Sequence, residues 1–258
     1  MLGKLLKHEW NATARKYGLF YLVLGIITIL AIIVHALPVD HVLFTIGEVS
    51  FLVLYILVLC GVFFCSTGMA VVRFYKNMVS DEGYLTFTLP AKVEQLVFSK
   101  FLVAVCWQIT TMLLVVLSLL SVFVIGHIEW SVFCEGVAFV TDEMGVILPV
   151  FGIMMLVSFM YQMLLYYLSI AVGQLFGNHK ILASVIAYCA LSFGIELIMM
   201  VVIIAVCGVI GFVEVSEQMS SFSGMATFYG ISIGWMAVLG AIEYFVICHL
   251  LKKKLNLN

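Results

Sequence analysis

The basic residues of this chain lie only in alternate joints between six long apolar runs. The runs cover residues 18–37, 47–72, 101–125, 146–172, 181–212 and 225–251. All 12 lysines and arginines fall before the first run, between the second and third, between the fourth and fifth, or after the sixth. The other three joints carry acidic charges and no basic ones. This alternation is typical of a membrane protein whose basic joints all face the cytoplasm.

Each run is long enough to cross a bilayer as a helix. A hydrocarbon core of roughly 30 Å needs about 20 helical residues. Only 10% of the residues are charged and 65% are apolar, whereas about a quarter of the residues in a soluble domain are charged. The sequence therefore predicts an all-α membrane protein with six transmembrane helices in residues 18–258 and both termini in the cytoplasm.

The segment before the first span, residues 1–17, has the pattern of an amphipathic helix. At about 100° per residue its apolar side chains gather on one arc, and its basic ones lie opposite. The apolar arc consists of Leu2, Leu5, Leu6, Trp10 and Tyr17. We expect this helix to lie in the cytoplasmic headgroup layer, with its lysines near anionic lipid. A solvated basic leader is the alternative.

The stretch from Arg73 to Lys100 is the most polar part of the chain and the only sizeable joint expected in the cytoplasm. Ser80, followed by Asp81 and Glu82, provides an N-cap and first-turn carboxylates for a short helix. Pro90 is placed to begin a second helix that leads into the third span. The sequence thus predicts a short helix, a break and a return to the membrane.

Four apolar residues lie between these signals and are too few to form a core: Tyr84, Leu85, Phe87 and Leu89. They require a partner or the membrane surface. An amphipathic helix that enters a groove of another protein would convert movement of that protein into tilting of the attached spans. The alternative is a loop folded onto its own helix ends.

At these two segments the chain resembles the permease subunits of ABC exporters of the type-two (ABCG-like, type V) class, especially small ones of Firmicutes bacteria. The resemblance covers the layout of the whole chain. The opening MLGKLLKHEWNATARKYG is similar to the family's basic connecting helix. DEGYLTFTLPAKVEQLVFSK is similar to its coupling helix followed by the third span.

The resemblance implies a transporter of two permeases and two cytoplasmic ATP-binding subunits in the bacterial plasma membrane. The coupling helix would contact the ATP-binding subunit through Asp81, Glu82, Gly83, Tyr84, Leu85, Phe87, Thr88 and Leu89. The chain contains no G-x-x-x-x-G-K-[ST] phosphate loop, so ATP and Mg²⁺ would bind to the partner subunit. We expect no catalytic site, cofactor, metal site or nucleic-acid contact in this chain.

Two carboxylates lie within the predicted spans. Glu196 lies near the middle of the fifth span, where an ionised carboxylate is costly, and is expected to face the protein interior. One reading is a contact to a cationic or hydroxyl-bearing substrate; the other is a residue that joins helices or the permease dimer. Glu243, in the cytoplasmic half of the sixth span, is expected to make a structural pair with a basic residue; the alternative is that it reaches the aqueous mouth. Glutamines 108, 162 and 174 are expected to join helices.

Other functions remain as alternatives. A secondary transporter or channel would favour internal repeats and charges along one pathway, and no clear repeat is present. An intramembrane enzyme needs a catalytic constellation, and Gly230 to Gly234 matches G-x-S-x-G only within a predicted helix. A permease for antimicrobial-peptide immunity or sensing would have the same layout. The pattern leaves open whether the permease pairs with itself or with a different chain.

Overall fold

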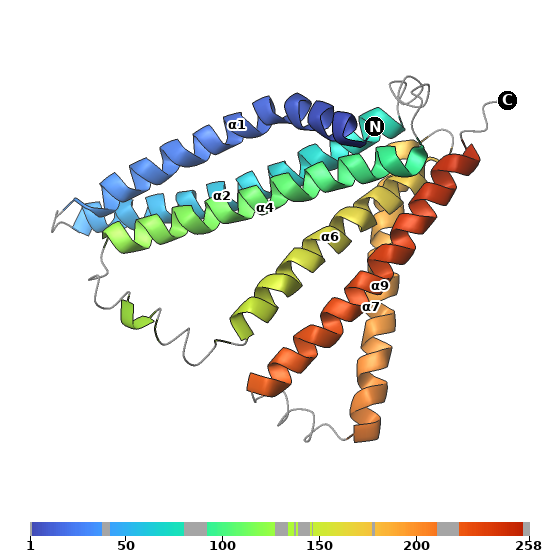
Figure 1. Ribbon diagram of the computed structural model, residues 1–258. Coiled ribbons are helices and arrows are strands. Elements are labelled where there is room, and N and C mark those ends of the chain that lie inside the picture. The colour runs from blue at the N-terminus through green and yellow to red at the C-terminus, as the bar shows by residue number, and fades with distance from the viewer. Residues whose placement is uncertain are drawn as a thin grey trace. The chain divides into compact units, whose positions relative to one another are not determined.

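The computed structural model describes residues 2–37, 42–79, 92–126, 134–136, 138, 145, 147–176, 179–210 and 222–254. Within these residues the chain forms long helices joined by short segments (Figure 1). The helices are α1 (Leu2–His35), α2 (Val42–Met78), α4 (Val93–Gly126), α6 (Ile147–Gly173), α7 (Lys180–Ile210) and α9 (Phe222–Lys254). Among these described residues, six helices are long and apolar enough to cross a membrane, which confirms the predicted all-α class with six membrane-length helices.

Several helices continue well beyond the apolar runs that predict them. α1 begins at Leu2 and passes through Gly18 without a break, α2 continues to Met78, and α4 already begins at Val93. An apolar run reports only the part of a helix that lipid can surround. The helix itself continues, because its backbone groups keep their i to i−4 hydrogen bonds beyond that run.

The chain divides into two compact units, which are described separately. The first consists of Met1–Ala70 and Leu102–Asp142, and the second of Val71–Phe101 and Glu143–Asn258. The first unit therefore holds α1, most of α2 and most of α4. The second holds α6, α7 and α9 together with the last turns of α2 and the first turns of α4.

The first unit is joined near one end by an aromatic stack on Trp107. Its indole lies 4.3 Å from the ring of Trp10 and 4.6 Å from that of Tyr17, measured between ring centroids. The indole Nε1–H donates to Thr13 Oγ1 over 2.8 Å. Aromatic contact and a satisfied indole N–H together fix the first half of α1 against α4.

A buried polar seam connects α1, α2 and α4 further along. The Tyr17 hydroxyl donates to the carbonyl of Ser66 over 3.0 Å, and Ser66 Oγ donates to Gln108 Oε1 over 3.1 Å. Gln108 Nε2 in turn donates to Thr67 Oγ1 over 3.1 Å. Gln108 therefore joins helices, as predicted, in the way that amides do between membrane helices.

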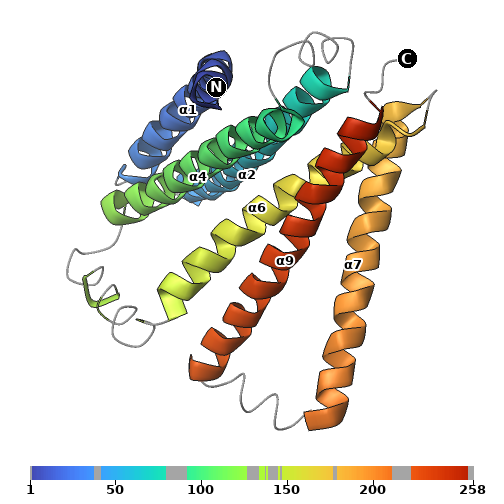
Figure 2. The same ribbon diagram turned by 45° about the vertical axis from the view of Figure 1, so that its right-hand side comes forward.

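In the second unit, α6 packs against both α7 and α9. The three helices approach one another at one end and diverge towards the other (Figures 1 and 2). At the close end a Cβ on Gly173 would lie 2.8 Å from both the Cα and the N of Ser184, so only glycine permits this approach. Along α9, Gly240 lies against Leu164, and Ile247 and Leu251 are fully buried.

Candidate functional site

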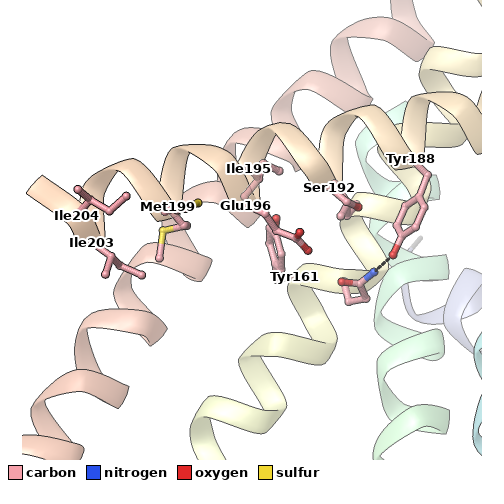
Figure 3. A pocket seen from close by; sticks show the side chains of 11 residues that line it. Tyr161, Tyr188, Ser192, Ile195, Glu196, Met199, Ile203 and Ile204 are labelled. Atoms are coloured by element: carbon pink, nitrogen blue, oxygen red, sulfur yellow. Dashed lines mark hydrogen bonds between the residues drawn. The ribbon is translucent and has the colours of Figure 1, made fainter. Parts of the chain in front are cut away.

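A groove of about 430 Å³ lies between α6 and α7. Figure 3 shows its side chains, with Tyr161 from α6 and a row of residues from α7. The volume falls in the range of small-molecule sites in proteins, about 300 to 1,000 Å³. The groove belongs entirely to the second unit, and it holds one of the two carboxylates that the sequence singled out.

The α7 wall of the groove changes from polar to apolar along the helix. Tyr188, Ser192 and Glu196 follow one another at four-residue spacing, which places them on one face. Met199 and Ile203 continue the same face into an apolar half. Figure 3 shows this order along α7. A ligand with a polar head and an apolar body would match both halves.

The polar half is held in place from α6. Gln162 Nε2 donates to the Tyr188 hydroxyl oxygen over 2.9 Å, the hydrogen bond drawn in Figure 3. Tyr166 stacks on Tyr188 with 5.0 Å between ring centroids. These two contacts fix the Tyr188 ring and leave its own O–H able to donate into the groove. The predicted role of Gln162 in joining helices is therefore confirmed.

Glu196 lines this groove and is exposed in the single chain. Its carboxylate has no hydrogen-bond or ion-pair partner among the described residues. The sequence predicts that this side chain faces the protein interior; in the single chain it lines the groove between α6 and α7. The helices diverge there, so the carboxylate reaches space that α6 does not fill.

Glu243 is 5% exposed, and neither carboxylate oxygen has a hydrogen-bond partner within the described residues. The structural pair expected for Glu243 is thus not formed by any described residue. The phenol of Tyr161 lies within electrostatic range of both Glu243 and Glu196. Tyr161 lines the groove next to Glu196 (Figure 3), whereas Glu243 does not line it.

The arc of residues predicted to meet the membrane surface is divided in the structure. Leu2, Leu5 and Leu6 are half-buried, whereas Trp10 is 40% exposed and Tyr17 is 1% exposed. Trp10 and Tyr17 both contact Trp107, as described above. The basic residues opposite this arc are exposed. Contact of this helix with lipid stays a prediction.

The residues predicted to form the coupling helix lie outside the described residues. This applies to Asp81, Glu82, Gly83, Tyr84, Leu85, Phe87, Thr88 and Leu89. The helices on either side are described, and both are held by the second unit. Phe74 stacks on Tyr167 of α6 with 3.8 Å between ring centroids. Tyr244 donates to the carbonyl of Glu94 over 3.1 Å, and Lys252 forms an ion pair with the Glu94 carboxylate.

The sequence analysis missed Tyr161, Tyr188 and Ser192 as groove residues. A signal was present for two of them, because Tyr188, Ser192 and Glu196 have helical spacing within an otherwise apolar run. No sequence pattern pairs Tyr161 with them, since that contact depends on how α6 packs against α7. Gly230 to Gly234 lies inside α9, so it does not form the turn that a serine hydrolase needs.

The fold defines a multi-pass helical membrane protein with a polar groove between two of its spans. Scans against protein-family models, curated proteins and solved structures found no match to the chain. Among the described residues, no three His, Cys, Asp or Glu side chains gather closely enough to hold a metal ion.

Proposed function

We propose that this chain is the membrane-spanning permease subunit of an ATP-driven ABC exporter in the bacterial plasma membrane. A separate cytoplasmic subunit would bind ATP and Mg²⁺ and hydrolyse ATP. A second permease, the same or different, would complete the transporter, which moves a hydrophobic or amphipathic substrate outward. The proposal is supported by the contacts that hold the two helices on either side of residues 80–91.

Both helices that flank this joint are attached to the second unit. On the α2 side, Phe74 is 1% exposed and stacked on Tyr167. On the α4 side, Glu94 accepts one hydrogen bond from Tyr244 and pairs with Lys252. A force applied to the joint would therefore reach α6 through one flank and α9 through the other. Packed helices transmit such a displacement because they shift as bodies rather than deform.

The charge pattern supports the orientation that this mechanism requires. Every lysine and arginine lies in a joint on the side of residues 80–91 or at a terminus on that side. By the positive-inside rule this side faces the cytoplasm, where an ATP-binding subunit would be available. The termini lie on the same side in this arrangement.

Co-purification and ATP hydrolysis test the proposal. The chain would be produced with a candidate ATP-binding subunit and purified in mild detergent. We expect a stable complex with vanadate-sensitive ATP hydrolysis. Phe87→Ala in the proposed coupling helix should weaken the complex. Phe64→Ala is the matched control, because Phe64 is 72% exposed on α2, away from that joint.

A different outcome would favour another class of protein. If the chain is stable alone and binds no ATP-binding subunit, the exporter proposal is wrong, and a secondary transporter or channel becomes the better account. If Phe87→Ala and Phe64→Ala weaken the complex equally, the contact does not run through residues 80–91. A permease for peptide immunity would give the same ATPase result and differ only in its substrate.

A further inference from the structure

Glu196 and Glu243 lie within membrane-length helices of the second unit and have no basic partner among the described residues. All 12 lysines and arginines lie in the joints or at the termini, so no span supplies a positive charge at the depth of Glu196. Glu243 has two buried oxygens without a partner among the described residues. A carboxylate at membrane depth costs several kcal/mol unless it is paired, hydrated or protonated.

The groove provides the other contacts that an organic cation uses. Tyr161 places an aromatic ring next to Glu196, and Tyr188 adds a second ring to the same groove about two turns away along α7. The face of an aromatic ring attracts a cation, and rings combined with a carboxylate are how proteins bind quaternary ammonium groups. Because Gln162 and Tyr166 already fix Tyr188, its ring requires little ordering when a ligand enters.

The apolar half of the groove explains why a small inorganic ion is a poor match. Beyond Glu196, the wall continues through Met199 and Ile203. These side chains offer dispersion contacts and no oxygen ligands, and methionine adapts to apolar groups of varied shape. A small hydrated cation would leave this half empty, whereas a cation with an apolar body would cover it.

We propose that the groove between α6 and α7 binds an apolar organic monocation, with its charged centre between Glu196 and the two tyrosine rings and its apolar body along Met199 and Ile203. Glu243 does not line the groove and does not touch the ligand. This inference relies on the proposed function only for the idea that the bound cation is transported outward. The binding site itself is formed by this chain alone.

Two probe ions of the same shape and opposite charge give the sharpest test. Tetraphenylphosphonium and tetraphenylborate differ mainly in the sign of their charge. The full chain would be placed in nanodiscs of zwitterionic lipid, and binding of each ion would be measured by equilibrium dialysis against empty nanodiscs. We expect saturable binding of the cation and none of the anion above the empty-disc level.

Variants then locate the bound cation. Glu196→Gln should weaken binding by about tenfold or more, because it removes the charge next to the ligand. Tyr188→Leu should weaken it as well, while Tyr188→Phe keeps the ring and its stacking on Tyr166 and should largely retain binding, because a cation accepts no hydrogen bond from the hydroxyl. Glu135→Gln is the control, because it removes the same charge from an exposed residue outside the spans.

Each result decides the question. Equal binding of both ions, or cation binding that Glu196→Gln leaves unchanged in a well-folded protein, overturns the proposal. If Glu196→Gln does not fold, the comparison of Tyr188→Leu with Tyr188→Phe carries the same decision. If the chain forms an active complex with an ATP-binding subunit but binds no cation, only this inference is overturned. If the chain binds the cation but forms no complex with an ATP-binding subunit, only the proposed function is overturned.

Discussion

At the scale of single residues, Trp107 joins α4 to α1 through two stacked rings and one hydrogen bond. Trp107→Ala removes a side chain that is 7% exposed and stacked against Trp10 and Tyr17. We expect a loss of about 3 to 5 kcal/mol in stability, as for other buried aromatic truncations. Trp107→Phe keeps a ring and removes the bond to Thr13, which should cost about 1 kcal/mol. Thermal unfolding in detergent measures both.

Trp235→Phe is the matched control for that hydrogen bond. The indole N–H of Trp235 is buried without a hydrogen-bond partner among the described residues, so removing it relieves an unsatisfied donor. We expect Trp235→Phe to leave the unfolding temperature unchanged or to raise it. Equal losses from the two Trp→Phe variants would show that the bond to Thr13 contributes nothing.

These residues also show the limit of sequence reasoning at this scale. The helical period correctly placed Trp10 and Tyr17 on one arc, because a period depends only on neighbours along the chain. Their common partner, Trp107, is about 90 residues away in the sequence and belongs to another helix. The same limit applies to Tyr161 and Glu196, which only packing between α6 and α7 brings together.

At the scale of helices, the close end of α6 and α7 depends on Gly173. Gly173→Ala would place a methyl group 2.8 Å from the Ser184 backbone. Backbone atoms cannot move aside as a flexible side chain does, so the two helices must separate. We expect a loss of about 1 to 3 kcal/mol, typical of overpacking, measured as a lower unfolding temperature in detergent.

Gly194→Ala is the matched control within α7. A Cβ at Gly194 would meet nothing within 4 Å, and alanine favours the helix over glycine. Its unfolding temperature should equal or exceed that of the parent chain. If both variants behave alike, the close approach at Gly173 does not limit stability.

The ion pair between Glu94 and Lys252 gives a second prediction at this scale, which rests on the proposed function. Glu94→Lys would place like charges opposite each other and separate the start of α4 from the end of α9. We expect slower ATP hydrolysis by the assembled complex. Glu94→Lys combined with Lys252→Glu should restore the rate, whereas a double variant no faster than Glu94→Lys alone would show that the pair plays no part.

Helix ends were harder to predict than helix existence. The six apolar runs identified the helices because lipid exposure imposes one composition on each span. Hydropathy does not detect the extra turns at Leu2, Met78 and Val93, which are amphipathic or polar. The helical period of residues 1–17 and the position of Pro90 predicted the first and the last of them, but nothing predicted the turns that end at Met78. These turns matter for function, because Phe74 and Glu94 lie in them and join the proposed coupling segment to α6 and α9.

At the scale of the whole molecule, the predicted orientation in the membrane rests on charge alone and is open to direct measurement. Cys134 is exposed in the joint between α4 and α6, which carries acidic charges only. In a variant that keeps Cys134 as its sole cysteine, a membrane-impermeant maleimide should label intact cells. The same variant carrying Cys134→Ser and Lys92→Cys, with its cysteine in a basic joint, should react only after the membrane is opened.

The reverse result for this pair would invert the topology and remove residues 80–91 from the cytoplasm, so no ATP-binding subunit could reach them. If both sites are labelled in intact cells, the basic and the acidic joints do not lie on opposite sides of the membrane. The predicted number of spans would then be wrong.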